Sequence, residues 1–431
     1  MSLSNLAGRT LAIENMRRRQ PRDGGRSKPN CRTQRLSSVS MSYSKHEKAR
    51  ATAWKRSTRV LPDEAKSPSP YVTKDGTAHG PPYDFCLPAE HAALSLLPEV
   101  RGEALALFAD LGIPWHAAVD GGPSNHLLSS QVQCVNALGQ MVTDPQPLRK
   151  AFGDLLGTAE VLQIEPGRYL TFEYIGPTDY FDEAPGGIRT RGAHCTSVDA
   201  AFLHRTHDDI VELVLIEWKY TESYRVREPD ARRDAVRSNR YWEAVRASDG
   251  PVRGNILAFE HLLDEPFYQL VRQQLLAHAL ERSGAEGASR VRLVHVLPAD
   301  NEEYQASLAR PEHRALGSSV SAVWGKLLRH EDRFLALDSA LFLDREITSR
   351  EYILRYAKDV VFDQKQLLDA IHVDEVSGVE DWLCTEAEFD GDVICRDDEV
   401  ELIMEAVGTA LPYPFTVTEL LNLAEELAVE V

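Results

Sequence analysis

Two short stretches decide the fold: residues 196–202 (TSVDAAF) and residues 211–220 (VELVLIEWKY). In the second stretch, residues 211–216 are apolar on both alternating faces apart from Glu212, which is typical of a central strand covered on both sides. Residues 206–209 (THDD) predict a turn. We therefore expect the two stretches to pair as a hairpin at the centre of a sheet.

Charged residues follow the apolar run directly. Because side chains alternate along a strand, Glu217 and Lys219 point to one face and Trp218 points to the other. Charges at the end of a buried strand need a partner or a metal ion. Asp199 lies on the paired strand, and with Glu217 it can form an oxygen-rich site for Mg²⁺. Lys219 can orient or deprotonate a water molecule, so the set is suited to metal-assisted hydrolysis of a phosphodiester bond.

An acid followed two residues later by lysine is a weak pattern, and the chain contains it three times, at residues 64–66, 217–219 and 363–365. The first lies in a basic, polar segment, and the last follows apolar residues at helical spacing. Only residues 217–219 end a strand-like run that has an acid on the preceding strand. The alternative interpretation is a surface ion pair at the end of a strand.

The arrangement Asp199, 17 residues, Glu217-x-Lys219 resembles the PD-(D/E)XK nuclease superfamily, which has the restriction-endonuclease-like fold. Three stretches are similar to a family of uncharacterised bacterial restriction endonucleases within it: residues 129–139 (SSQVQCVNALG), 217–224 (EWKYTESY) and 265–276 (EPFYQLVRQQLL). The resemblance spans about residues 85–345. It implies that Asp199 and Glu217 are metal ligands and that Lys219 is the catalytic lysine.

The chain departs from the superfamily pattern at two places. Val198 stands where the superfamily name has proline, which affects backbone shape rather than chemistry. The predicted helix at 124–139 offers no clear glutamate, so Gln131 is the polar residue best placed to complete the site. Glu173, on a predicted strand at 168–176, is the rival.

Two further helices carry candidate nucleic-acid contacts. Residues 231–243 align Arg233, Arg237 and Arg240, and cations of this kind neutralise a phosphate backbone. Residues 264–283 place Gln269, Arg272 and Gln273 on one face. In both helices the alternative is a solvated polar face.

The charge distribution divides the chain into three parts. Of 431 residues with a net charge of −18, residues 1–70 carry 16 Lys and Arg against 5 acids, and residues 371–431 carry one Arg against 17 acids. We predict a basic, largely disordered arm over 1–80, a PD-(D/E)XK nuclease-like domain over 81–345 and an acidic helical extension over 346–431. Residues 319–343 also look mostly helical. The expected fold class is α/β: a mixed central sheet flanked by helices, with helical additions.

These observations predict a Mg²⁺-dependent endonuclease acting on DNA, with Mn²⁺ as a substitute for Mg²⁺. No apolar run is long enough for a membrane span, the six cysteines form no CxxC pair, and no phosphate loop or dinucleotide fingerprint is visible, so we expect a cytoplasmic protein without nucleotide-driven chemistry. Alternatives are a non-catalytic nucleic-acid-binding protein that keeps the fold and a protein-interaction module that uses the acidic C-terminus. Cleavage of both strands would call for a homodimer, although no dimerisation motif is visible.

Overall fold

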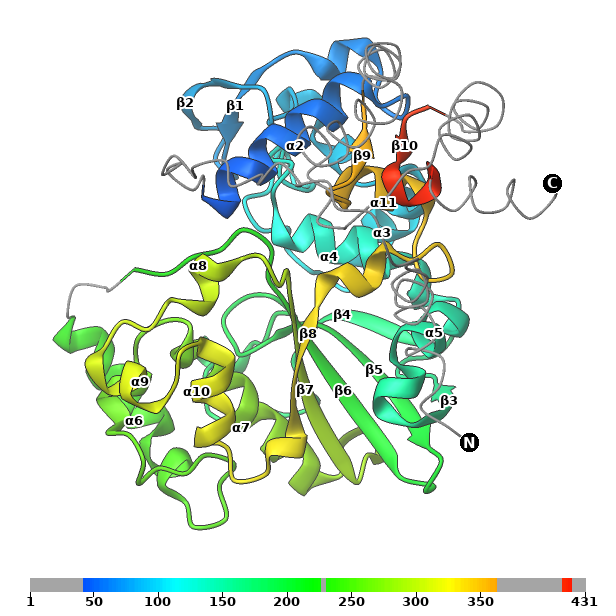
Figure 1. Cartoon of the computed structure of the whole chain (residues 1–431). Helices are drawn as coiled ribbons and strands as arrows, with labels where there is room; N and C mark the ends of the chain where they lie inside the picture. The colour runs from blue at the N-terminus through cyan, green and yellow to red at the C-terminus, as the bar shows by residue number, and fades with distance from the viewer. Residues whose placement is uncertain (1–41, 226–229, 363–412, 421–431) are drawn as a thin grey trace, which may run out of the picture. The chain divides into compact units, whose positions relative to one another are not determined.

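A six-stranded mixed sheet forms the centre of the computed structural model, which describes residues 42–225, 230–362 and 413–420 (Figure 1). The strand order is β3-β5-β6-β7-β8, and β4 also pairs with β5. The strands are β3 (Thr158–Leu162), β4 (Leu170–Tyr174), β5 (Val198–Thr206), β6 (Val211–Trp218), β7 (Arg290–Leu297) and β8 (Phe334–Asp338).

Strands β5 and β6 form the predicted antiparallel hairpin, whereas β6, β7 and β8 run parallel to one another. In the turn, the amide of Asp209 donates to the carbonyl of Thr206 at 3.0 Å. The expected fold class is therefore confirmed. Residues 319–343 are mostly helical as expected, with α10 (Val320–Leu327) and two 3₁₀ segments, but they also contain β8, whose apolar residues pair with β7 instead of continuing a helix.

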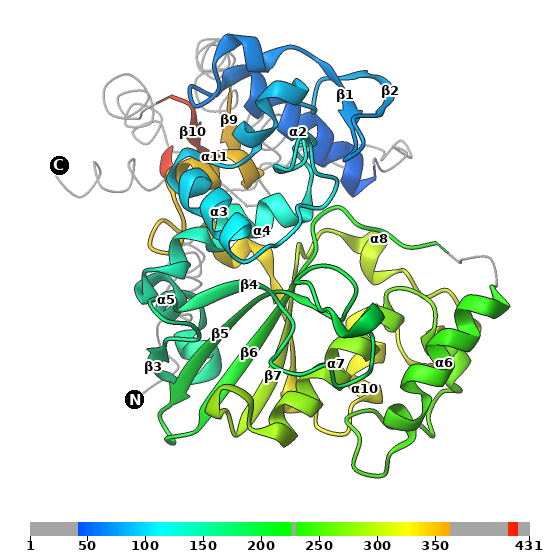
Figure 2. The same ribbon diagram turned by 180° about the vertical axis from the view of Figure 1, so that it is seen from behind.

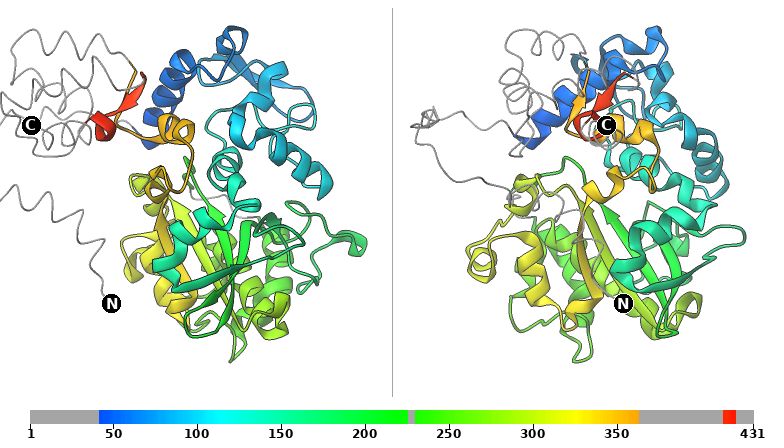
Figure 3. Two further views of the ribbon diagram at one scale, coloured as in Figure 1. Left: turned by 90° about the vertical axis from the view of Figure 1, so that its right-hand side faces the viewer. Right: turned by 45° about the vertical axis from the view of Figure 1, so that its right-hand side comes forward.

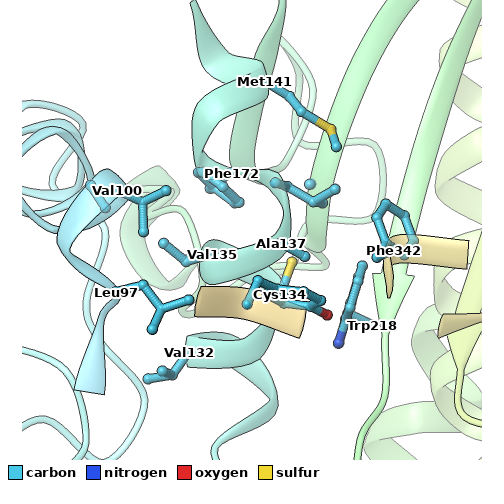
Figure 4. Packing of buried hydrophobic residues seen from close by; sticks show 14 of the residues in the cluster. Leu97, Val100, Val132, Cys134, Val135, Ala137, Met141, Phe172, Trp218 and Phe342 are labelled. Atoms are coloured by element: carbon cyan, nitrogen blue, oxygen red, sulfur yellow. The ribbon is translucent and has the colours of Figure 1, made fainter. Parts of the chain in front are cut away.

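Helices cover both faces of the sheet. On one face, Val214, Ile216 and Trp218 share a core with α3 (Pro98–Asp110), α4 (Ser130–Leu138) and α5 (Pro145–Leu156). Figure 4 shows this core, in which Trp218 lies beside Phe342 with a ring separation of 4.9 Å.

On the other face, Leu213 and Leu215 pack against α6 (Ala231–Arg246), α7 (Phe267–Ser283) and α10 (Val320–Leu327) (Figure 2). Shorter helices are α8 (Glu302–Gln305) and α9 (Pro311–Leu316). Single 3₁₀ turns lie at Asp63–Lys66, Ala89–Ser95, Gly139–Val142, Pro185–Gly187, Phe259–Leu262, Ala285–Gly287, Glu331–Arg333 and Ser339–Leu343. No helix in the described ranges is long and apolar enough to cross a bilayer.

Local sequence signals explain where the helices beside the sheet begin and end. The Asp144 side chain caps α5 by accepting from the amide of Gln146 at 2.9 Å, and Gly157, in the left-handed region at φ 65°, ends it. Helix α4 begins at Ser130, after the cap Ser129, and so occupies only the second half of the predicted 124–139 helix. This start places Gln131 in the first turn of α4.

The predicted disorder of residues 1–80 is wrong for residues 42–80. These residues form α2 (Tyr43–Ser57) and a hairpin of β1 (Ser69–Val72) and β2 (Ala78–Tyr83). Trp54 of α2 is only 1% exposed, because it lies in the same apolar core as α3 and α4, and Arg355 from α11 (Arg350–Tyr356) lies 4.7 Å from the centre of its ring. Residues 1–41 lie outside the described part of the chain.

Helix α11 also carries the core beyond residue 345, where we expected the extension to start. Tyr352 and Tyr356 belong to the same core as α3 and α4. Beyond α11, β9 (Val360–Val361) pairs with β10 (Phe415–Thr416) (Figure 3). Most of the acidic C-terminal segment lies outside the described residues.

Candidate active site

The register of the sheet brings the predicted carboxylates together at one end. In the β5–β6 pair, Ala200 lies opposite Ile216, so the same register continued by one residue places Asp199 opposite Glu217. In the β6–β7 pair, Glu217 lies opposite His295. Residues directly opposite each other share a face of the sheet. Asp199 and Glu217 therefore project to the same side, the side covered by α7.

Lys219 lies against Glu217. Its Nζ donates to Glu217 Oε1 at 2.5 Å, and both side chains are almost fully buried. Burial lowers the pKa of Lys219, but Glu217 and neighbouring acidic groups outweigh burial and raise this pKa well above its usual value. Lys219 therefore stays a charged ammonium, which suits orienting a water molecule or a phosphate better than removing a proton.

Asp199 sits among other carboxylates. Its Oδ2 accepts from the amide of Trp218 at 2.6 Å, and the side chain keeps part of its surface open to solvent. Burial, then the charges of Glu217 and Glu173, raise the pKa of Asp199 well above its usual value. The carboxylates at this position exceed the positive charge available from Lys219.

Glu173 is the third carboxylate. Residues on either side of it pair with β5, Phe172 with Ala200 and Tyr174 with Val198, which puts Glu173 next to Asp199. Glu173 has a left-handed backbone (φ 48°). Burial raises the pKa of Glu173 and is the largest effect. The hydrogen bonds from Gln131 and Ser197 lower this pKa and the charge of Glu217 raises it, so the net change is an increase.

Gln131 supports Glu173. The Gln131 Nε2 donates to Glu173 Oε1 at 3.0 Å, and Gln131 Oε1 accepts from the amide of His116 at 2.8 Å. Ser197 Oγ donates to the other oxygen of Glu173 at 3.0 Å. Of the two residues that the sequence left as rivals, Glu173 lies beside the carboxylate pair and Gln131 holds Glu173.

Helix α7 holds Glu217 from the opposite side. Gln269 Nε2 donates to Glu217 Oε1 at 2.6 Å, and Gln273 Nε2 donates to Glu217 Oε2. We expected these two glutamines to contact the site or nucleic acid, and the structure places both against Glu217. With Lys219, they give Glu217 three side-chain donors and fix its orientation.

Three of the four expected arginines gather near α7. Arg272 Nε donates to Thr196 Oγ1 at 3.0 Å, and Arg237 lies 3.6 Å from the centre of the Tyr268 ring. Arg240 and Arg272 both line a polar cavity of about 430 Å³ that also includes Gln269 and Gln273. Arg233 does not line this cavity and pairs with Asp230 at the start of α6.

The donor set fits a hard divalent cation. Within the described residues, no group of three or more His, Cys, Asp and Glu side chains is arranged as a preformed metal centre. The pairing of β4, β5 and β6 nevertheless brings Glu173, Asp199 and Glu217 side by side with Lys219 as the adjacent cation, an excess of negative charge that a divalent cation would balance. Asp199 and Glu217 offer the oxygen ligands that Mg²⁺ prefers, with Glu173 as a third carboxylate nearby.

Two further groups, His295 and Glu183, lie around the site. His295, opposite Glu217, is fully buried, and burial together with the smaller effect of the Lys219 charge lowers its pKa to about 3. Glu183 accepts from the Thr196 hydroxyl at 2.6 Å and pairs with Arg272 at 3.4 Å. The strand-like stretch at 290–297 already indicated a core or near-site histidine at His295, whereas nothing local in the sequence points to Glu183.

A mixed sheet with helices on both faces and two acids and a lysine at the end of its central hairpin define a restriction-endonuclease-like protein. The model of the family described as Restriction Endonuclease associating with ARP matches residues 48–356. The chain belongs to this family. No curated protein and no solved structure matches the chain.

Proposed function

We propose that this protein is a Mg²⁺-dependent endonuclease that hydrolyses phosphodiester bonds of DNA, with Mn²⁺ able to replace Mg²⁺. The observation that carries the proposal is the row of Glu173, Asp199 and Glu217 beside the buried ammonium of Lys219. Membership in a restriction-endonuclease family supports the reaction class. The two arginines that line the adjoining cavity, Arg240 and Arg272, support a nucleic acid as the substrate, and we propose DNA.

The residues divide the work of hydrolysis. Asp199 and Glu217 would hold the cation, which supplies charge neutralisation and a lowered pKa for bound water. Lys219 places a fixed positive charge beside Glu217, where it can orient the attacking water and stabilise charge that develops on the phosphate. Gln269 and Gln273 keep the Glu217 carboxylate in one orientation.

Cleavage assays test this proposal directly. Plasmid and linear DNA are incubated with the full chain in Mg²⁺, in Mn²⁺ and in a chelator, in parallel with Lys219→Ala. We expect ion-dependent cleavage by the wild type and a loss of about 10²–10⁴-fold in Lys219→Ala, the usual contribution of one positioned catalytic group. Lys150→Ala, a partly exposed lysine of α5, is the matched control and should cleave normally.

If wild type and Lys219→Ala leave DNA equally intact with both ions, the chain is a non-catalytic nucleic-acid-binding protein. Binding of labelled DNA then replaces cleavage as the readout.

The family description also names an association with ARP, and we propose that this chain takes a protein partner of that kind. A homodimer stays a prediction, which light scattering on the purified chain checks.

A further inference from the structure

The polar cavity beside the carboxylates has the size of a small-molecule site. Its volume of about 430 Å³ falls within the ~300–1,000 Å³ of typical ligand pockets. Gln273 and Ser197 line it and also bond Glu217 and Glu173. The cavity and the proposed metal site therefore share a wall.

One buried acceptor in this wall has no partner. Gln273 is 1% exposed, and its Nε2 faces two acceptors, the Glu217 carboxylate and the Ser197 carbonyl, which fixes the orientation of the amide. Its Oε1 is buried and receives no hydrogen bond from the described residues. Buried polar atoms are almost always paired, so this acceptor is an exception in the wall, but it has no surface open to the cavity.

The same cavity offers positive charge for a phosphate. Arg240 is exposed and makes no hydrogen bond or ion pair with any described residue. Arg272 is held in place by Thr196 and Glu183. Among the described residues of the cavity wall Glu183 is the one acid, and Thr196, Tyr241 and Arg272 all donate to it, so Arg272 balances its charge and Arg240 leaves the wall with net positive charge. Arginine side chains in such an arrangement suit phosphate oxygens.

We propose that this cavity holds one unpaired nucleotide of the substrate strand, next to the bond that is cut. Its phosphate lies against Arg240 and Arg272. A base stacked in a duplex cannot enter a cavity, so the preferred substrate is single-stranded, frayed or mismatched at the scissile position. The proposal rests on the proposed nuclease function and adds the substrate class to it.

Two measurements test the nucleotide-binding role of the cavity separately from the proposed cleavage reaction. In the first, kcat/KM is compared for a fully paired duplex, the same duplex with one mismatch, and the single strand. We expect the unpaired substrates to be cut on the order of tenfold faster or more, because the nucleotide is already unstacked. Equal rates on paired and unpaired substrates would overturn the proposal.

In the second, binding of deoxyadenosine 5′-monophosphate is measured by calorimetry without any cleavage. We expect saturable binding to the wild type that Arg240→Ala weakens by about tenfold, the effect of losing one charge-assisted hydrogen bond. Arg282→Ala, an exposed arginine at the far end of α7, is the control and should bind normally. If the wild type does not bind the nucleotide, or if Arg240→Ala binds it as tightly as the wild type, the cavity proposal is refuted. Absent cleavage with intact, Arg240-dependent binding sinks the nuclease proposal and leaves the cavity as a nucleotide site.

Discussion

The two ends of the central strands each bury a carboxylate, with opposite electrostatic results. At the end away from the site, Glu212 lies opposite His204 on β5 and opposite Arg290 on β7. Glu212 is fully buried, and it pairs with Arg290 at 2.7 Å and with Arg292 at 2.6 Å. Burial raises its pKa, but His204 and the arginines outweigh burial and lower the pKa to about 2.

At the site end, the same strands place Asp199 opposite Glu217 and next to Glu173. Burial raises the pKa of Asp199, as it does that of Glu212, but at this end the neighbouring carboxylates of Glu217 and Glu173 raise it further. Lys219 is the cation paired with Glu217 in this cluster.

We propose that this contrast separates a structural charge, at Glu212, from a functional one, at Asp199. A buried acid surrounded by cations is already neutralised, so it stabilises the fold and has no need of a ligand. A cluster of acids with too little positive charge is destabilising by itself and favours binding of a cation. Neutral substitutions at the two ends should therefore have opposite consequences.

The largest expected effect is on catalysis. Asp199→Asn removes a proposed ligand and should lower cleavage of DNA by about 10²–10⁴-fold, because the cation loses one of its two strand-borne carboxylates. Circular dichroism should show a folded variant. Glu212→Gln, assayed at equal folded concentration, should cleave like the wild type. Similar losses in both variants would contradict the division between the two ends.

The next effect is on stability. Glu212→Gln leaves Arg290 and Arg292 without their shared counter-charge, so we expect the free energy of unfolding to fall by about 2–3 kcal/mol, as for hydrogen bonds to charged groups. Urea titration measures this change. The exposed Glu160→Gln on β3 is the control and should stay within about 0.5 kcal/mol. A Glu212→Gln variant as stable as Glu160→Gln would show that the cluster is not stabilising.

Acid pH should weaken the Glu212 cluster with a defined sign. The pKa of Glu212 is lowered on folding from 4.5 to about 2, so its stabilisation is complete above pH 4.5 and is lost as the pH falls toward 2. We expect the free energy of unfolding to decrease across that window more steeply in the wild type than in Glu212→Gln. Urea titrations at a series of pH values test this, and parallel pH profiles would refute it.

The sequence predicted the part of the site that depends on one hairpin. A turn at 206–209 sets the register, and the register makes Asp199 face Glu217 and puts Lys219 on the same side. Glu173 depends on a separate strand and a left-handed backbone, which no local pattern specifies. Only the structure could therefore show that Glu173, and not Gln131, lies beside the carboxylate pair.

Long-range packing explains the larger error about the N-terminal segment. Helix α2 has a basic, weakly patterned sequence, and residues 42–80 looked disordered for that reason. Trp54 is buried in the apolar core of α3 and α4 and lies against Arg355 of α11, about 300 positions further along the chain. Similarly, β8 looked helical because its apolar residues are specified by pairing with β7 and not by their own spacing.

The smallest expected effect is a thermal shift, and it tests the site end without any reaction. A ligand that binds only the folded state stabilises it by mass action, so Mg²⁺ at about ten times its Kd should add roughly 1–2 kcal/mol. For a chain of this size such a gain raises Tm by about 1–2 °C. The shift should vanish in Asp199→Asn and in Glu217→Gln, which remove proposed ligands, and should persist in Glu212→Gln, whose carboxylate is already neutralised by arginines. Differential scanning fluorimetry with Mg²⁺ against equal ionic strength of NaCl measures it. A shift of the same size in all variants would mean that the cation binds elsewhere, and the carboxylate excess at Asp199 would then need another explanation.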